Sequence, residues 1–474
     1  MKNIYKNTAI ITAIMITLGN VSCKNDFLEV TPKGKLIAQK VDDYNLLLNN
    51  LELLNVNSLS QVPMGDEVDA IQEYFVSASL KSQRLFRWDP VIYESDQDAD
   101  EMKVYMKNIY TYNKIINEID AATEGSDAEK NSIKAEAMAG RAWTYFQLIN
   151  YYGKPYQEST SSTDPGFPIV TKADVTETTF ERTNVKAVYE FIVDGLKEAI
   201  PNLPNRTINR LRMSRSAAEA ILGKVYLFMG QPYKAVEQLN NAVNNTAHTD
   251  ISLSFYDYNT TALPTSITVA MNTEVIYGKQ SSNYWTINNL FATGELVIKP
   301  ATVALFEATD KRLGWYAASP RGASAIYPQG MKRRIAPSIT QIGMTLPDLY
   351  LLRAEANARI GDLDGAVQDL LTLRNKRMPT NASSIPQNIA SDQKSLLNFV
   401  IEERIREFAV QGYRWFDMRR LSVDPLFADI PTPTHTIYTM AGDAVDTYTL
   451  STNRYVLRFP DKVMNENPNM QNND

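Results

Sequence analysis

The residues best equipped for chemistry lie in one segment near the end of the chain, Glu402–Arg420, where carboxylates and guanidinium groups alternate. Such groups can act as general acids and bases, and they can equally form ion pairs that hold helices together. On a helix, Glu402 and Arg406 stand four residues apart and can pair, while Glu403 and Glu407 fall on successive turns. We therefore interpret the segment as a structural ion-pair network rather than a catalytic site.

Few other residues could support catalysis or bind a metal ion. The chain contains two histidines, His248 and His435, which lie far apart in polar segments that we expect to be loops, and a single cysteine, Cys23. These are too few for a zinc site or a Cys/His pair. No glycine-rich phosphate loop precedes a helix, and nothing marks two carboxylates as a hydrolase pair. We predict no catalytic residue and no cofactor.

An acidic run, Asp96–Glu101, has the look of a calcium loop. The calcium-binding pattern requires glycine at its sixth position and glutamate at its twelfth, where this chain has Glu101 and Lys107. Acidic residues also favour the start of a helix, because its dipole is positive there. We interpret the run as a helix start and predict no metal site.

Aromatic side chains outside the helical patterns are the best candidates for ligand binding. A flat indole or phenol ring stacks on the C–H face of a sugar ring, while polar side chains bond to its hydroxyls. The candidates that lie in irregular segments are Trp285, Tyr284, Trp315, Tyr316, Trp88, Arg87 and Tyr74. Each ring can equally belong to the core of its lobe. Most of these rings lie in the insert, and the insert is barely richer in aromatic residues than the whole chain, in which they make up 10%.

The start of the chain has the pattern of a secretory signal. Two lysines precede the apolar run Thr8–Leu18, and small residues lead to Cys23. The run is too short to span a membrane, which needs about 20 residues. Cleavage before a cysteine resembles the processing of bacterial lipoproteins, although Asn20 stands where leucine is usual. We predict a signal peptide at 1–22 and a lipid on Cys23; the alternative is ordinary secretion with a free thiol.

Size and charge restrict the remaining classes. The chain has 474 residues, more than the roughly 250–300 that one core supports, so two sub-domains or an elongated helical array are expected. Its formal charge is −6, and loss of the two leader lysines and acylation of the new amino terminus leave about −8. No basic face is evident, so we predict that the protein binds no nucleic acid. With one cysteine, no internal disulfide is possible.

Apolar residues at helical spacing predict helices over Val41–Leu54, Asp100–Ala121, Ala128–Tyr151 and Asn184–Ile200. A repeated pattern then follows in two copies. Gly230 matches Gly361, and Ala235 matches Ala366 in the same frame. The glycine lets the chain reverse at a helix end, and the alanine lets two helices approach closely. Both copies resemble the tetratricopeptide unit.

A long insert separates the two copies. It has little helical period, contains the strand-like pieces Glu274–Tyr277 and Leu296–Ile298, and is broken by prolines. The predicted division is a signal peptide at 1–22, a tether at 23–40, helical parts at 41–245 and 347–422, a ligand-binding insert at 246–346, and an irregular segment at 423–474 that packs on the insert. Loops on a rigid scaffold are where binding residues concentrate.

Several motifs in order resemble one family. They are Cys23 followed by Phe27-Leu28-Glu29, Arg141–Leu148 leading to Tyr152–Tyr156, the repeat pair, Glu402–Phe408 followed by Gly412–Arg420, and Phe459-Pro460 through Asn467-Pro468. Together they resemble the SusD/RagB family of outer-membrane nutrient-binding lipoproteins. No single motif is specific; the order on a lipoprotein leader carries the resemblance.

The resemblance implies a mainly α fold, a SusD-like tetratricopeptide-like helical scaffold with a large, mostly irregular inserted lobe containing short strands. It also implies a cell-surface protein, anchored in the outer membrane through lipid on Cys23, that performs no chemistry. Its implied partners are an oligosaccharide or other nutrient and a SusC-like TonB-dependent transporter. The alternatives are a surface glycoside hydrolase and a helical adaptor lipoprotein that binds only protein.

Overall fold

The computed structural model describes residues 38–56, 60–177, 179–205, 209–248, 250–264, 272–282 and 295–474. The predicted leader, Cys23 and most of the tether lie outside the described residues, as do Tyr284 and Trp285.

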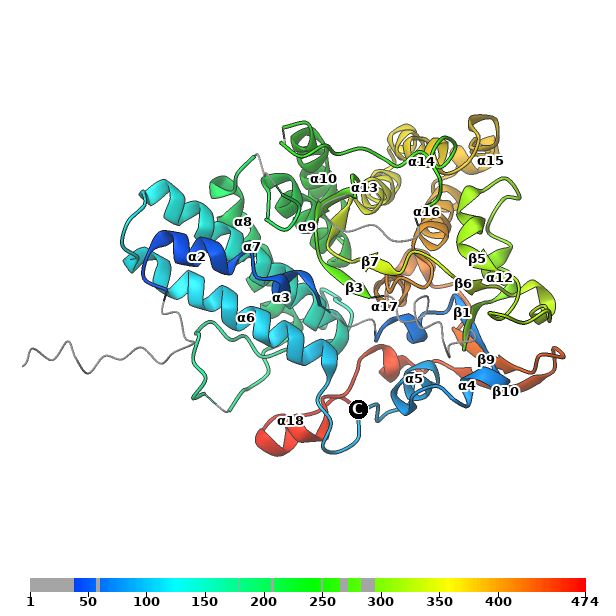
Figure 1. The fold of residues 1–474 in the computed structure, drawn as a ribbon, viewed down its shortest axis with the longest axis horizontal. Helices are drawn as coiled ribbons and strands as arrows, with labels where there is room; N and C mark the ends of the chain where they lie inside the picture. The colour runs from blue at the N-terminus through cyan, green and yellow to red at the C-terminus, as the bar shows by residue number, and fades with distance from the viewer. Residues whose placement is uncertain are drawn as a thin grey trace, which may run out of the picture.

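Helices make up most of the regular structure (Figure 1). The α-helices are α2 Val41–Leu47, α3 Leu51–Leu54, α4 Gln72–Phe75, α5 Leu80–Phe86, α6 Asp100–Glu118, α7 Asp127–Tyr152, α8 Val185–Ala199, α9 Arg215–Phe228, α10 Pro232–Thr246, α12 Pro300–Val303, α13 Leu346–Ile360, α14 Leu363–Arg377, α15 Gln387–Ala390, α16 Gln393–Phe408, α17 Arg414–Leu421 and α18 Asp461–Glu466. The strands are β1 Val68–Ile71, β2 Val275–Tyr277, β3 Gln280–Ser282, β4 Leu296–Ile298, β5 Tyr316–Ala317, β6 Arg333–Arg334, β7 Ile339–Gln341, β8 Met344–Thr345, β9 Thr434–Tyr438 and β10 Ala444–Thr449. The predicted fold class is confirmed.

The predicted helices form, with one difference at the start of the scaffold. The single helix expected over Val41–Leu54 is divided into α2 and α3. Asn50 lies at the division, and its side-chain oxygen accepts a hydrogen bond from the backbone N–H of Glu52 at 3.0 Å. An asparagine in this position satisfies a free amide at a helix start. It therefore begins a new helix instead of continuing the old one.

The two repeats form helix hairpins, α9–α10 and α13–α14. Gly230, with φ 69°, and Gly361, with φ 86°, occupy the left-handed region at the turn of each hairpin, which glycine adopts without strain. Ala235 and Ala366 are completely buried where the paired helices meet. Helix α10 packs against α13. The hairpins therefore stack in one array although a long insert separates them in sequence (Figure 1).

The largest sheet assembles three distant parts of the chain in the order β10-β9-β1-β4. Strand β1 runs antiparallel to β4, with Val68 opposite Ile298, and parallel to β9, with Ala70 opposite Ile437. The segment after residue 423, expected to be irregular, thus supplies two strands. We call the part of the molecule around this sheet, with α4, α5, α12, β5 and β6, the lobe; it lies at the opposite end from α2 and α8 (Figure 1).

One hydrophobic core continues from the scaffold into the lobe. It includes Trp143 of α7, Val225 of α9 and Ile437 of β9. A separate cluster holds α2 against α6, through Tyr44 and Ile115. The lobe therefore packs on the helical array through a shared, close-packed core, which holds the lobe surface in a fixed position.

Candidate ligand-binding surfaces

The charged segment Glu402–Arg420 is largely buried, and its charges are paired. Glu403 has no exposed surface. Its carboxylate forms three ion pairs, with Arg312 at 2.7 Å, Arg374 at 2.6 Å and Arg406 at 3.0 Å. The predicted pair between Glu402 and Arg406 is present at 3.2 Å. We call these residues, together with Arg404, Asp417 and Arg420, the ion-pair network.

The pKa values of Glu403 and Asp417 show that these carboxylates remain ionised. Burial alone would raise the pKa of Glu403, but the neighbouring guanidinium groups outweigh it and hold the pKa far below its ordinary value. The same holds for Asp417, which pairs with Arg404 and Arg420, each at 2.8 Å. A general acid or base needs a pKa near the working pH. These carboxylates stay ionised and paired, so the structural interpretation of the segment is confirmed.

Trp88 is a core residue, 5% exposed. Its ring stacks on the ring of His435 at a centroid distance of 3.9 Å, and its indole N–H donates to the carbonyl oxygen of Met64 at 3.1 Å. His435 is itself completely buried on β9, so the expectation that it lies in a polar loop is wrong; the alternation of β9 turns it inward. Trp88 has a φ of 54°. This uncommon backbone angle is held in place by the stacked rings.

Arg87, next to Trp88, reaches the surface. Its guanidinium group contacts the Asp89 carboxylate at 2.9 Å, and the two side chains keep 24% and 31% of their surface exposed. Tyr448 of β10 lies beside this pair. Burial and Asp446 raise the pKa of Tyr448, and the positive charge of Arg87 opposes them. Tyr448 is thus a further aromatic side chain of this face that the sequence reasoning missed, although the Ala444–Thr449 pattern could have indicated a strand.

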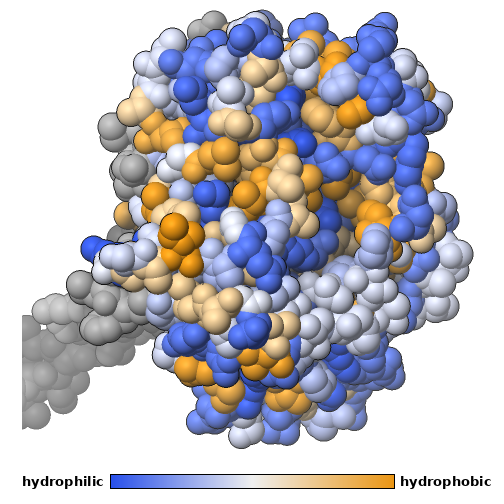
Figure 2. Space-filling model, turned by 90° about the vertical axis from the view of Figure 1, so that its right-hand side faces the viewer, coloured by the Kyte–Doolittle hydropathy of each residue, from blue (hydrophilic) through white to orange (hydrophobic). Residues whose placement is uncertain are grey.

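Tyr74 of α4 is partly exposed and packs on a small apolar cluster. The buried members of this cluster are Ile71, Val297, Tyr327 and Met331, and its partly buried members are Tyr74, Tyr438 and Met440. We call Tyr74, Arg87, Tyr438 and Tyr448 the lobe face, because they are partly exposed and lie on or beside α4, α5, β9 and β10. Tyr74 and Tyr438 pack on this small cluster, whereas Tyr448 packs on the main core, on the other side of the sheet. Figure 2 shows this side of the molecule, where hydrophobic and hydrophilic residues are intermingled around a hollow.

Trp315 and Tyr316 lie deeper, 4% and 7% exposed. The Tyr316 hydroxyl accepts a hydrogen bond from Arg334 at 3.0 Å. The Trp315 ring meets the ring of Tyr258 edge-on at 5.2 Å. The structure therefore places Trp88, Trp315 and Tyr316 in the core, the alternative that the sequence left open, and leaves Tyr74 and Arg87 accessible on the lobe.

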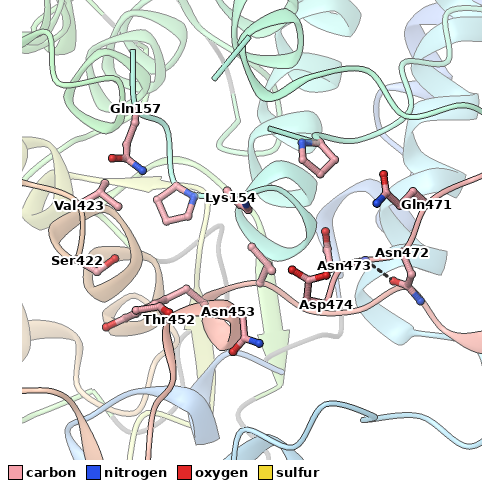
Figure 3. Close-up of a pocket in the computed structure, with 14 residues that line it drawn as sticks. Lys154, Gln157, Ser422, Val423, Thr452, Asn453, Gln471, Asn472, Asn473 and Asp474 are labelled. Atoms are coloured by element: carbon pink, nitrogen blue, oxygen red, sulfur yellow. Dashed lines mark hydrogen bonds between the residues drawn. The ribbon is translucent and has the colours of Figure 1, made fainter. Parts of the chain in front are cut away.

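A cleft with a volume of about 460 Å³ lies elsewhere, at the end of α7 (Figure 3). Its polar lining residues are Lys154, Gln157, Ser422, Thr452, Asn453, Gln471, Asn472, Asn473 and Asp474. Amides and hydroxyls of this kind can bond to a hydroxylated ligand. We call it the polar cleft. Sequence reasoning missed it because its lining comes from segments around 155, 422, 453 and 472.

Local hydrogen bonds hold the walls of the polar cleft. Lys154 pairs with Asp164 at 3.0 Å. Asn473 donates to the backbone carbonyl of Tyr152 at 2.8 Å, and Arg182 donates to the carbonyl of Gln471 at 3.0 Å. Several lining side chains are therefore structural, and the exposed amides of Gln471 and Asn453 are the groups best placed for a ligand.

The described parts of the chain contain neither a metal-binding cluster nor a membrane-spanning helix. They contain no group of three or more histidine, cysteine, aspartate or glutamate residues that could hold a metal ion. Glu101, from the run that resembled a calcium loop, lies in the first turn of α6 and accepts hydrogen bonds from the hydroxyls of Ser60, Tyr93 and Tyr152. None of the helices described here combines the length and apolar character needed to cross a membrane.

Comparison with known proteins gives consistent matches over most of the chain. The family model SusD-like_3, described as "Starch-binding associating with outer membrane", matches residues 26–227, and the model of the SusD family matches residues 327–474. SusD-like protein P2 of Formosa agariphila is 27% identical over 345 residues, which are 62% of this chain and 66% of that relative. The match thus spans just under two thirds of the relative's length.

Solved structures share the fold. A SusD superfamily protein from Bacteroides thetaiotaomicron superposes with a TM-score of 0.70 at 19% identity, covering 92% of this chain and 100% of that one. A laminarin binding SusD-like protein superposes with a TM-score of 0.60 at 17% identity, covering 92% of this chain and 99% of that one. At these identities the similarity establishes the common architecture.

Proposed function

Because the chain belongs to the SusD family, we propose that it binds an oligosaccharide at the cell surface and delivers it, unchanged, to a SusC-like TonB-dependent transporter. Family descriptions associate SusD-like proteins with the outer membrane and with carbohydrate binding. The buried, paired carboxylates of Glu403 and Asp417 support binding without catalysis, since neither is exposed and the pKa of each is far below a working pH.

The anchor is part of the same proposal. Lipid on Cys23, with the signal peptide at 1–22 removed, would hold the protein in the outer leaflet of the outer membrane, and the tether at 23–40 would join the lipid to the fold. Attachment through both the lipid and the transporter would be firmer than attachment through one acyl chain alone. Replacing Cys23 with serine is expected to release the protein from the membrane fraction.

The observation that carries the proposal is the lobe face. Its accessible aromatic rings and the Arg87–Asp89 pair border one sheet, with Tyr74 and Tyr438 on one side of it and Tyr448 beside Arg87 on the other. Rings and polar groups of these kinds recognise sugar rings and their hydroxyls. We propose that Tyr74 and Arg87 contact the glycan directly. Tyr284 and Trp285, which precede β4 in sequence, are proposed to add stacking contacts. Trp88 and Tyr316 would support these residues from below.

Affinity electrophoresis tests the proposal. The chain from residue 24 onward, which includes every described residue, is run through gels containing laminarin or starch. Retardation by a glycan without release of product is expected. Release of product would favour the hydrolase alternative. No retardation by any glycan, together with stable capture of the transporter, would favour the protein-binding adaptor.

Point variants locate the site. Tyr74→Ala and Arg87→Ala are expected to weaken retardation, because each removes a ring face or a hydrogen-bonding group. Tyr233→Ala is the matched control, since Tyr233 is 74% exposed on α10, away from the lobe. If Asn453→Ala in the polar cleft abolishes retardation while both lobe variants bind normally, the glycan site belongs in the cleft and the assignment to the lobe face is wrong.

A further inference from the structure

A second, smaller cavity lies where the insert meets the helical scaffold. Its volume is about 70 Å³, and it is lined by β7, β8, the end of α16 and the loop that follows α10. Its floor is buried and includes Tyr258, Phe408 and Trp315. Part of its rim is more exposed, at Asn272 and Ile339. A buried floor beneath an open rim is the shape of a ligand pocket rather than of a packing defect.

Two polar atoms in this cavity lack partners. The indole N–H of Trp315 and the amide oxygen of Gln341 are both buried, and neither has a hydrogen-bond partner among the described residues. Both side chains line the cavity and are more than nine-tenths buried, 4% and 9% exposed. Leaving a buried donor or acceptor unsatisfied destabilises the fold. Two such atoms in one cavity indicate a guest that satisfies both.

The orientation of the Gln341 amide follows from its neighbours. The amide nitrogen of Gln280 donates to the side-chain oxygen of Asn55 at 2.8 Å. The oxygen of Gln280 is therefore free to accept from the amide nitrogen of Gln341, at 3.5 Å. This chain of amides leaves the Gln341 oxygen as the group presented to the cavity. The cavity thus offers one donor, from Trp315, and one acceptor, from Gln341.

A hydroxyl group is the chemistry that matches both atoms, because it accepts from an N–H and donates to an oxygen. Charged guests fit poorly. The carboxylates of Glu274 and Glu407 line the cavity and would repel an anion, and both are already paired with Arg377 at 2.8 Å, so they leave little attraction for a cation. The aromatic floor suits the C–H face of a ring.

From this geometry we infer that the cavity binds the hydroxyl-bearing edge of one neutral ring, with Trp315 donating to it and Gln341 accepting from it. The volume has room for about five water-sized groups. The ring belongs either to the end of a bound glycan or to a free monosaccharide. The first source rests on the proposed function, and the second does not.

The indole resonances of the tryptophans report on the site directly. The chain has five tryptophans, and Trp315→Phe removes one indole signal, which assigns it while keeping a ring of similar shape. Glucose, galactose and mannose are then titrated separately into the ¹⁵N-labelled protein, and laminarin is titrated in parallel. A shift of the Trp315 indole signal is expected with at least one of these sugars. If only a free monosaccharide shifts the Trp315 signal, the cavity is a monosaccharide site. If only laminarin shifts it, the cavity binds the end of a glycan.

Measuring the sugar affinity of point variants completes the test. Trp315→Phe and Gln341→Met are each expected to weaken binding of the active sugar about tenfold, the loss that one unsatisfied hydrogen bond produces. Trp415→Phe is the matched control, because its indole N–H is also buried without a partner but lies outside this cavity. An unshifted Trp315 signal with every sugar means ordered water only and overturns the inference. That result leaves the proposed function standing if laminarin or starch still retards the protein in gels.

Discussion

Two regions of this molecule bury positive charge in opposite ways. In the ion-pair network, Arg404 lies between the carboxylates of Asp417 at 2.8 Å and Asp348 at 2.9 Å. Between α3, α6 and α7, Lys279 is equally buried, 1% exposed, but its ammonium group donates to the carbonyl oxygen of Leu53 and to the Tyr112 hydroxyl. No described carboxylate acts on it as a charged partner.

The pKa values separate the two regions. Burial alone would lower the pKa of Arg404, but the two aspartates outweigh it and raise the pKa above its ordinary value. At Lys279 burial is unopposed and lowers the pKa to about 7. Aromatic rings surround the ammonium group, the nearest being Tyr277 at 4.9 Å. The partner, rather than the depth, decides whether a buried charge stabilises the fold or loses its proton.

The largest effect is expected from breaking the ion-pair network. Glu403→Gln keeps the shape of the side chain but leaves three guanidinium groups without their shared carboxylate. Removing one member of a buried pair costs about 3–5 kcal/mol. Urea denaturation should show this loss. Glu402→Gln is the control, because the Glu402 side chain is 43% exposed, and it is expected to change stability by less than about 0.5 kcal/mol. If the two variants lose stability equally, the buried pairs of Glu403 contribute no more to stability than the exposed pair of Glu402.

A pH-dependent effect is expected at Lys279. Its pKa is about 7 in the fold and 10.5 when exposed, so the unfolded chain binds more protons between these values and stability rises with pH. The slope from this one group is at most about 1.4 kcal/mol per pH unit. Lys279→Met removes it. The stability of the natural protein relative to this variant should therefore increase between about pH 7.5 and 9.5.

Denaturant midpoints at several pH values measure this difference, in which all other titrating groups cancel. Lys376→Met is the control, because Lys376 is 42% exposed and paired with Asp257 at 3.0 Å. Its stability curve should run nearly parallel to that of the natural protein. If the curve of Lys279→Met is also parallel, the ammonium group is not titrating as its burial requires.

The smallest effect on stability is expected at the lobe face. The Arg87–Asp89 pair keeps part of both side chains in water, and such pairs contribute about 0.2–1 kcal/mol. Arg87→Ala should therefore lower stability by less than about 1 kcal/mol, as measured by thermal unfolding, while it weakens glycan retardation. A large loss of stability would mean that Arg87 is a structural residue like those of the ion-pair network and not a binding residue.

Local patterns in the sequence were sufficient for the scaffold. Apolar spacing identified α6, α7 and α8, because a helix repeats its contacts every three to four residues along one segment. The same reasoning failed where distant segments meet. Strand β1 was not predicted, since its four residues, Val68–Ile71, gain their hydrogen bonds from β4 and β9. His435 was placed in a loop because its buried position depends on the distant rings of Phe86, at the end of α5, and Trp88.

The sequence by itself thus determined the helical array, the family resemblance and the structural role of the charged segment Glu402–Arg420, while the pairing of Glu403 with Arg312 and Arg374 came from the tertiary structure. Only the tertiary structure decided which aromatic side chains remain accessible. Trp88 and Trp315 became core residues because strands from other parts of the chain pack over them, whereas Tyr74 stays partly exposed. Helix periodicity is a property of neighbouring residues, but burial of a loop residue depends on what the rest of the chain places against it.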